Sequence, residues 1–282
     1  MSCRSILITR ILYLYMVILL FILGLCVGSF LNVLADRLPR GEDVIKSRSH
    51  CEYCKHKLLW YELIPVLSFL FQKGKSRCCH TPLPFQYPIS ELATGFGFAV
   101  IFCFKSSVIS FGTLFSPQIF YSQFFILTYL VSIILFSSLL VIFISDLKYE
   151  IIPMEMIIIG FIAVFCFHFL HFTDSVHFIP YPLSFLGAGL FFFCLWFFSK
   201  GKAMGDGDIY LAALLGLYLG FPAIIIALYG AFLTGAIAGI ILILVRKKSM
   251  KAHIPFGPFL IIGFVIANVW GERIIKLWMS LI

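Results

Sequence analysis

Acidic residues stand at the edges of two apolar stretches in this chain of 282 residues, of which only 12% are charged. The segment "KGKAMGDGDIYLAALLG" places Asp206 and Asp208 among glycines, immediately before a run of apolar residues. A third acid, Asp146, follows the apolar run in "VIFISDLKYEIIP". Carboxylates at the ends of long apolar segments are costly when they are even partly buried, so these aspartates are candidates for a function.

Two neighbouring carboxylates are chemically suited to peptide hydrolysis. At hydrogen-bonding distance both cannot ionise easily, and one proton becomes shared between them. The ionised member then takes a proton from water while the protonated member polarises a carbonyl group. Because such a pair titrates as a unit, the sequence assigns neither role to one residue. The "GDGD" spacing leaves an alternative open, since either Asp206 or Asp208 could serve as an N-terminal helix cap.

Gly205 and Gly207 lie on either side of Asp206. Glycine adopts backbone angles that are closed to other residues and lets a second chain approach closely. We therefore expect these two glycines to present Asp208 from a turn at the start of a helix and to admit a substrate strand.

The elements that carry these acids are predicted to cross a membrane. Hydrophobic residues make up 61% of the chain and its mean hydropathy is +1.05, whereas a soluble domain has roughly 45–50% apolar residues. Runs long enough for a helical crossing, about 20 residues, recur along the chain. We predict an all-α polytopic membrane protein with about eight transmembrane helices, of which the sixth is short. The expected spans are 11–34, 91–110, 120–145, 154–172, 182–199, 208–221, 222–245 and 255–279.

The basic residues predict the orientation, because Lys and Arg accumulate in cytoplasmic loops. One set of loops, which includes residues 36–90, holds 16 of the 21 Lys and Arg residues. We therefore expect both termini on the periplasmic side, and Asp146 and Asp208 at the cytoplasmic face. This bias accounts for the formal charge of +8 without a nucleic-acid partner.

The predicted organisation has three parts: a first transmembrane segment (1–35), a cytoplasmic cysteine-rich loop domain (36–90) and a multi-span core (91–282). The loop domain contains Cys51, Cys54, Cys78 and Cys79. A segment of about 55 residues buries only a marginal core, so a covalent or metal staple would help it fold. Disulfides are not expected on the reducing side of the membrane.

The chain resembles the prepilin leader peptidases, bacterial inner-membrane aspartic proteases with a glycine-x-glycine-aspartate motif. Six segments carry the resemblance in the family's order and cover most of the length. They are "GSFLNVLADRLPRG" (28–41), "CEYCKHKLLWYELIPVLSFLFQKGKSRCC" (51–79), "YPISELATG" (87–95), "DLKYEIIP" (146–153), "MGDGDIYLAALLGLYLG" (204–220) and "IPFGPFL" (254–260).

The resemblance implies that Asp146 and Asp208 form the catalytic pair, with Asp206 adjacent to it. Family enzymes cut the short basic leader from type IV pilins and type II secretion pseudopilins that lie in the same bilayer. They cleave at the cytoplasmic side, which agrees with the orientation predicted from the basic residues. Many members also methylate the new N-terminus with S-adenosylmethionine, and this second activity rests on analogy alone.

The chain departs from the family pattern near the pair and in the loop. Met154 stands where the family often has an acid, and Tyr210 stands where it usually has a lysine. Family loops carry two pairs of cysteines that are suited to tetrahedral zinc. Here Ser76 occupies the third position and Cys78 is additional. The resemblance therefore implies zinc at Cys51, Cys54, Cys79 and Cys78, although adjacent cysteines make a strained chelate and His50, His56 or His80 could complete the shell.

Two other classes of protein remain open from the sequence. In a degenerate assembly protein without catalysis, the cysteines of the zinc-binding module would matter and the aspartates would not. An ion-coupled transporter would need inverted repeats with acids near the bilayer midplane, and the sequence shows no such repeat.

Overall fold

The computed structural model describes residues 3–44, 48–51, 53–108, 119–170, 179–202, 204–245 and 255–280. Within these ranges the regular elements are helical, apart from two isolated β-bridges in the loop between residues 48 and 85. Two short 3₁₀ turns, η1 (Leu38–Arg40) and η2 (Trp60–Leu63), accompany the α-helices. The α-helices are α1 (Cys3–Arg37), α2 (Leu67–Phe71), α3 (Gln86–Val108), α5 (Ile119–Tyr149), α6 (Met154–Leu170), α8 (Pro180–Ser199), α9 (Gly207–Leu219), α10 (Ala223–Leu244) and α11 (Gly257–Met279).

The helices confirm the expected all-α membrane architecture. Among the described residues, six segments are long and apolar enough to cross a bilayer, and two apolar helices are shorter. The shorter ones are Met154–Phe169 and Gly207–Leu219. With 13 residues, α9 is about 20 Å long, less than the roughly 30 Å hydrocarbon core, so the sixth expected span is short. The six long segments are Arg10–Arg40, Gln86–Phe104, Ile126–Tyr149, Pro180–Ser199, Ala223–Leu244 and Gly257–Met279.

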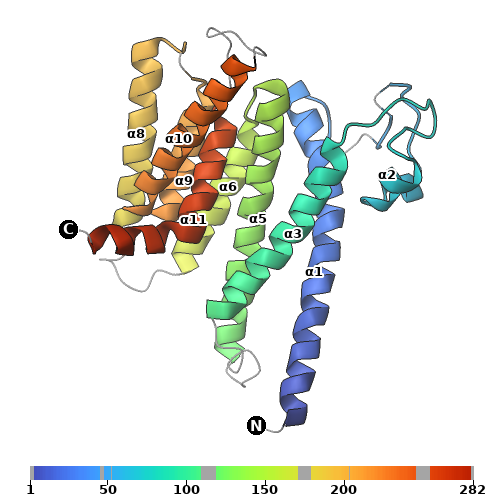
Figure 1. The fold of residues 1–282 in the computed structure, drawn as a ribbon, viewed down its shortest axis with the longest axis horizontal. Coiled ribbons are helices and arrows are strands. Elements are labelled where there is room, and N and C mark those ends of the chain that lie inside the picture. The colour runs from blue at the N-terminus through green and yellow to red at the C-terminus, as the bar shows by residue number, and fades with distance from the viewer. Residues whose placement is uncertain are drawn as a thin grey trace. The chain divides into compact units, whose positions relative to one another are not determined.

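The chain divides into two compact units, Met1–Val141 and Ile142–Ile282, and the division falls within α5 (Figure 1). The basic residues at 246–253 and the end of the expected fourth span at 171–172 lie outside the described residues.

In the first unit α1 packs along α3 through small residues. A Cβ atom on Gly24 would lie 2.7 Å from the Cα of Gly95, and one on Gly28 would lie 2.8 Å from the Cα of Glu91. Only glycine at these positions lets the two backbones approach this closely. The segments 28–41 and 87–95, which are far apart in the sequence, therefore lie against each other.

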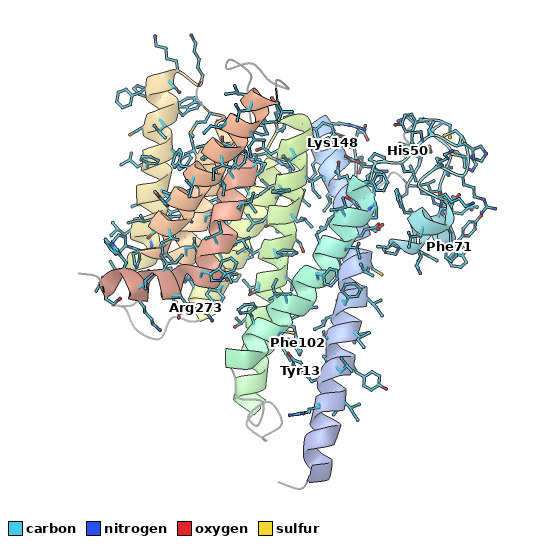
Figure 2. The ribbon with its side chains drawn as sticks, viewed as in Figure 1. Tyr13, His50, Phe71, Phe102, Lys148 and Arg273 are labelled. Carbon is cyan, nitrogen blue, oxygen red and sulfur yellow. The ribbon has the colours of Figure 1, made fainter. Side chains whose placement is uncertain are left out.

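Buried polar side chains join the same two helices. The Ser90 hydroxyl donates to Oδ1 of Asn32 at 2.6 Å, and the Tyr87 hydroxyl donates to Oδ2 of Asp36 at 3.0 Å. Buried polar groups need such partners, because an unpaired one costs free energy. Further along the unit, the Phe102 ring lies 5.5 Å from that of Tyr13 and 5.9 Å from that of Tyr129 (Figure 2).

In the second unit α8 packs on α9, and α10 packs on α11. A Cβ atom on Gly216 would lie 2.5 Å from the Ser184 carbonyl oxygen, which shows how close the backbones of α8 and α9 come. The buried His168 of α6 donates through Nε2 to the Leu217 carbonyl at 2.8 Å. The end of α5 and the starts of α9 and α11 lie at one end of this unit (Figure 1).

Candidate active site and metal centre

Asp146 lies in the last turn of α5, and the start of α11 binds it. Its side chain is only 5% exposed, and its Oδ2 accepts a hydrogen bond of 3.0 Å from the backbone N–H of Gly257. Gly257 is the first residue of α11, where backbone N–H groups have no partner within the helix and the helix dipole favours negative charge. The start of α11 therefore fixes one carboxylate oxygen of Asp146.

Residue 257 must be a glycine for this contact to form. A Cβ atom there would lie 2.6 Å from Oδ2 of Asp146, shorter than real Cβ contacts. The sequence placed Gly257 within the last of the six segments but gave it no role. A glycine followed by Pro258 at a helix start was the only local signal.

Asp208 is the second residue of α9 and is also 5% exposed. The backbone amide of Gly205 provides a hydrogen-bond donor to its carboxylate. Its Oδ1 is buried and has no hydrogen-bond partner among the residues that the structure describes. A buried carboxylate oxygen without a donor is unusual, because its desolvation is not offset. Such an atom is suited to hold a proton or a water molecule.

The two carboxylates lie near enough for the negative charge of Asp146 to repel that of Asp208. Ile152 lies between the start of α9, which carries Asp208, and the start of α11, which binds Asp146. A Cβ atom on Gly207 would lie 2.9 Å from the Ile152 Cβ, and one on Gly257 would lie 3.4 Å from its Cδ1. Ile152 thus packs α9 and α11 around the end of α5.

Asp206 has a different role from Asp208. It is exposed, it is the N-cap residue of α9, and its Oδ1 accepts the Gly207 N–H at 3.0 Å. The helix-cap reading is therefore confirmed for Asp206. Met154 and Tyr210, the departures from the family pattern, are both exposed, whereas Asp146 and Asp208 are buried.

The expected role of the two glycines in this motif is wrong in part. Neither Gly205 nor Gly207 has a positive φ, so the turn does not depend on backbone angles closed to other residues. Gly207 is needed because Ile152 occupies the space of a side chain there. At Gly205 the nearest atom to an added Cβ would be Oδ2 of Asp208 at 3.9 Å, an ordinary contact.

The loop of the first unit contains two turns with the same pattern of backbone hydrogen bonds. In the first, Cys51 N–H donates to the His56 carbonyl at 2.8 Å and Lys55 N–H to the Cys51 carbonyl at 2.9 Å. In the second, Ser76 N–H donates to the Thr81 carbonyl and His80 N–H to the Ser76 carbonyl, both at 2.8 Å.

A second feature shows that the two turns are equivalent. Lys55 and His80, at the fifth position of each turn, have φ values of 57° and 56°. Ser76 is therefore the counterpart of Cys51, and Cys79 is the counterpart of Cys54. Sequence spacing suggested this correspondence, and the repeated backbone pattern establishes it.

The four cysteines of the loop gather at one point. The Sγ atoms of Cys51, Cys54, Cys78 and Cys79 all lie within 4.8 Å of one another, and this cluster contains no histidine among the described residues. Tetrahedral zinc with Zn–S bonds of about 2.3 Å separates its sulfur ligands by about 3.8 Å. The distances from the Cys79 Sγ to those of Cys51 (3.7 Å) and Cys78 (3.9 Å) fit this value. The Cys54–Cys78 distance of 2.9 Å is shorter and would have to open.

Hydrogen bonds around the cluster favour the thiolate form of one cysteine. The hydroxyl and backbone N–H of Thr81 lower the pKa of Cys79 to about 6, because they stabilise its negative charge. The hydrogen bond with Cys78 raises the pKa of Cys54 to about 12. Thiolates are the form that binds metal. The four residues therefore fit a metal ion that takes the place of the protons in the hydrogen bonds between their sulfur atoms.

The helices and the two acids define a class of protein. It is a polytopic membrane protein in which two buried aspartates lie at the same end of a helical unit. Residues 22–104 match the Bacterial Peptidase A24 N-terminal domain, and residues 133–240 match the type IV leader peptidase family. The chain belongs to this type IV leader peptidase family.

Several curated relatives support the same membership. A prepilin leader peptidase/N-methyltransferase from Bacillus subtilis strain 168 is 32% identical over 94% of this chain and 99% of its own length. Its namesake from Aeromonas salmonicida strain A449 is 30% identical over 94% of both chains. A third, from Myxococcus xanthus strain DK1622, is 33% identical over 82% of this chain, and the match spans 64% of that relative. No solved structure matches the chain.

Proposed function

We propose that this protein is a membrane aspartic endopeptidase that removes the basic leader from type IV prepilins or type II secretion pseudopilins. The catalytic pair is Asp146 and Asp208. One observation carries the proposal: two buried carboxylates, near enough to repel each other, lie at one end of a helical unit in a chain of the type IV leader peptidase family. The names of the relatives point to prepilin leaders as substrates. Acids at helix ends also favour a peptidase over a transporter, in which they are expected near the midplane.

The reaction needs one proton on the pair. The ionised carboxylate takes a proton from water, and the oxygen of that water attacks the carbonyl carbon of the scissile peptide bond. The protonated carboxyl group donates a hydrogen bond to the carbonyl oxygen as negative charge develops there. The C–N bond then breaks, and a proton from the pair passes to the leaving amine. The pair thus ends with the same number of protons.

The surroundings of the two acids suit these steps. Gly257 holds Oδ2 of Asp146 in place, so this carboxylate needs little reorganisation. The unpaired, buried Oδ1 of Asp208 is the atom that we assign to the shared proton or the attacking water. Two buried carboxylates near each other share one proton, because both cannot ionise easily.

The setting is the bacterial inner membrane, with the substrate in the same bilayer. We propose that both termini are periplasmic and that loop 36–90 and the acid pair are cytoplasmic. The excess of basic residues in one set of loops supports this orientation. A leader rich in Lys or Arg would then meet the pair at the edge of its own apolar helix.

A second activity, methylation of the new N-terminus, is proposed on the names of the relatives, which include N-methyltransferase. S-adenosylmethionine would supply the methyl group, which leaves its sulfonium sulfur for the amine nitrogen as the amine loses a proton. No residue of this chain is assigned to this step.

We also propose that the cysteine cluster binds zinc. Four thiolates within 4.8 Å of one another make a closed site without an open position, which is typical of structural zinc. Cys51 and Cys54 would hold it from the first turn of the loop, and Cys78 and Cys79 from the second. The ion would hold the two turns together, in a loop that is too small to bury a large hydrophobic core.

The decisive experiment co-expresses a prepilin with Asp146→Asn or Asp208→Asn and determines the mass of the prepilin N-terminus. Both variants should leave the leader attached while the enzyme stays in the membrane. Asp206→Asn is the matched control, because Asn is nearly as good a helix cap as Asp and the side chain is exposed. Normal processing by either of the first two variants would overturn the assignment and favour a degenerate assembly protein.

A further inference from the structure

Helix α2 presents an apolar face that the described part of the chain leaves exposed. Leu67, Leu70 and Phe71 are all more than half exposed, and Phe71 reaches 83%. Their spacing at i, i+3 and i+4 places them on one side of the helix. Single exposed apolar residues are common on protein surfaces, whereas a contiguous group at one site marks a surface that binds something.

The helix is fixed to the start of a membrane span. The backbone N–H of Val66, directly before α2, donates a hydrogen bond of 2.7 Å to Oε2 of Glu91 in α3. The Phe69 ring also packs on Phe85, at 5.4 Å between centroids. Val66 has a φ of 60°, a rare conformation for a β-branched residue that persists only when its surroundings impose it. The position of α2 beside α3 is therefore specified by contacts.

The anchor gives the depth of α2 relative to the bilayer. Glu91 is buried and lies five residues after Gln86, where the apolar span begins, which places it about 7.5 Å along the helix. Helices that lie in the membrane interface bury their apolar face about 5–10 Å into the boundary between headgroups and acyl chains. Val66 and the start of α2 are thus level with this boundary and the upper acyl chains. In Figure 2, Phe71 lies at the end of the loop opposite His50.

The charges around α2 complement an anionic surface. Residues 53–85 contain five basic side chains and one acidic one. Three of the basic residues, Lys73, Lys75 and Arg77, follow α2 within six residues and are exposed. A short apolar face flanked by Lys and Arg is typical of helices that lie in the membrane interface, and basic residues next to a membrane attract anionic headgroups.

We infer that α2 is seated in the lipid interface of the bilayer, with Leu67, Leu70 and Phe71 among the upper acyl chains and Lys73 and Lys75 at anionic headgroups. The loop then contacts the membrane at a third place, besides the spans α1 and α3 at its two ends. This inference rests on the first unit alone and does not depend on catalysis by Asp146 and Asp208.

The test uses the full-length protein in vesicles of phosphatidylethanolamine and phosphatidylglycerol. The photoreactive residue benzoylphenylalanine replaces Phe71, and lipid adducts are measured by mass spectrometry after irradiation. The matched control is Tyr53, an aromatic residue of the same loop that is 62% exposed, and the reference position is Leu19, which is 59% exposed within α1. We expect lipid adducts at positions 19 and 71, with roughly tenfold fewer at 53, because only the first two lie among acyl chains.

Three results would overturn the inference. Adducts at position 19 alone would show that α2 lies in water. Adducts of position 71 with peptides of the protein would show that another part of the chain, or a second copy, covers the face. Equal lipid labelling at 53 and 71 would show that the loop touches lipid without a preferred face. Replacing phosphatidylglycerol by phosphatidylcholine should lower the yield at 71, and an unchanged yield would refute the role of Lys73 and Lys75.

Discussion

The backbone N–H of Gly257 donates a hydrogen bond of 3.0 Å to Oδ2 of Asp146, although 111 residues separate the two in the chain. The contact joins the end of α5 to the start of α11 and orients one member of the proposed pair. Because residue 257 has no side chain, the carboxylate sits directly against the helix start.

Gly257→Ala should therefore damage catalysis more than folding. The added Cβ would lie 2.6 Å from Oδ2 of Asp146, so the carboxylate must move. A displacement of about 1 Å lowers the rate by about 10²-fold. The rate of leader removal by purified enzyme measures this effect, and the amount of protein in the membrane reports on folding.

Gly271→Ala on the same helix is the control for that prediction. Its Cβ would have no contact closer than 4.0 Å, to the Ala223 Cβ, and the change likewise replaces a glycine of α11 by alanine. Equal rates for the two variants would show that the contact between Gly257 and Asp146 does not orient the pair.

In the glycine–aspartate motif, Gly207→Ala should impair the enzyme and Gly205→Ala should not. A Cβ atom on Gly207 would lie 2.9 Å from the Ile152 Cβ, whereas one on Gly205 would have no neighbour closer than 3.9 Å. The first change pushes the start of α9 and Asp208 away from Ile152, and overpacking of this kind costs about 1–3 kcal/mol. Thermal stability and the rate of leader removal, measured on both variants, check the prediction. A stronger effect at 205 would contradict the packing described here.

The sequence was sufficient to predict the helical membrane architecture and the candidate acids, because both depend on local patterns. Long apolar runs indicate spans, and the "GDGD" sequence before such a run indicates Asp208 and a helix cap at either Asp206 or Asp208. The roles of Gly257 and Ile152 could not be predicted, because each depends on contacts between segments far apart in the chain. The role of Gly207 was misread for the same reason, since Ile152 and not the backbone conformation requires it.

The cysteine loop shows the same limit of sequence reasoning. Spacing alone suggested that adjacent cysteines chelate poorly, yet the second turn directs both Cys78 and Cys79 into the cluster. Ser76 keeps the position of the missing ligand, is buried, and lies 3.1 Å from the Cys78 Sγ and 3.5 Å from the Cys51 Sγ.

The starts of two helices also differ from the spans expected from the sequence. Helix α1 begins at Cys3 and α3 at Gln86, whereas the expected spans began at residues 11 and 91.

The equivalence of the two turns predicts a rescue of metal binding. Cys78→Ser should remove one of four sulfur ligands and lower the zinc content, since three thiolates leave the tetrahedral shell incomplete. Ser76→Cys combined with Cys78→Ser should restore it, because residue 76 occupies the place that Cys51 has in the first turn. Zinc per protein, measured by elemental mass spectrometry, and the sulfur-to-metal absorption bands after cobalt substitution report the ligand set.

Cys166→Ala is the control for this pair of variants, because Cys166 is a free cysteine in α6, outside the cluster. Full zinc content in Cys78→Ser would show that Cys78 is not a ligand. A double variant as poor in zinc as the single one would refute the equivalence of Ser76 and Cys51.

The last prediction concerns Glu91, which the structure makes an anchor for α2. Glu91→Ala leaves the Val66 N–H without its acceptor, at a cost of about 1–3 kcal/mol, and releases a residue held at positive φ. Hydrogen exchange in peptides covering residues 66–71 should then become faster, while Glu91→Gln, which keeps an acceptor oxygen, should remain closer to the parent protein. Glu155→Ala, at an exposed site in the first turn of α6, controls for the loss of a negative charge. Unchanged exchange in Glu91→Ala would mean that the contacts of Phe69 alone hold α2, and the depth deduced from Glu91 would then lose its basis.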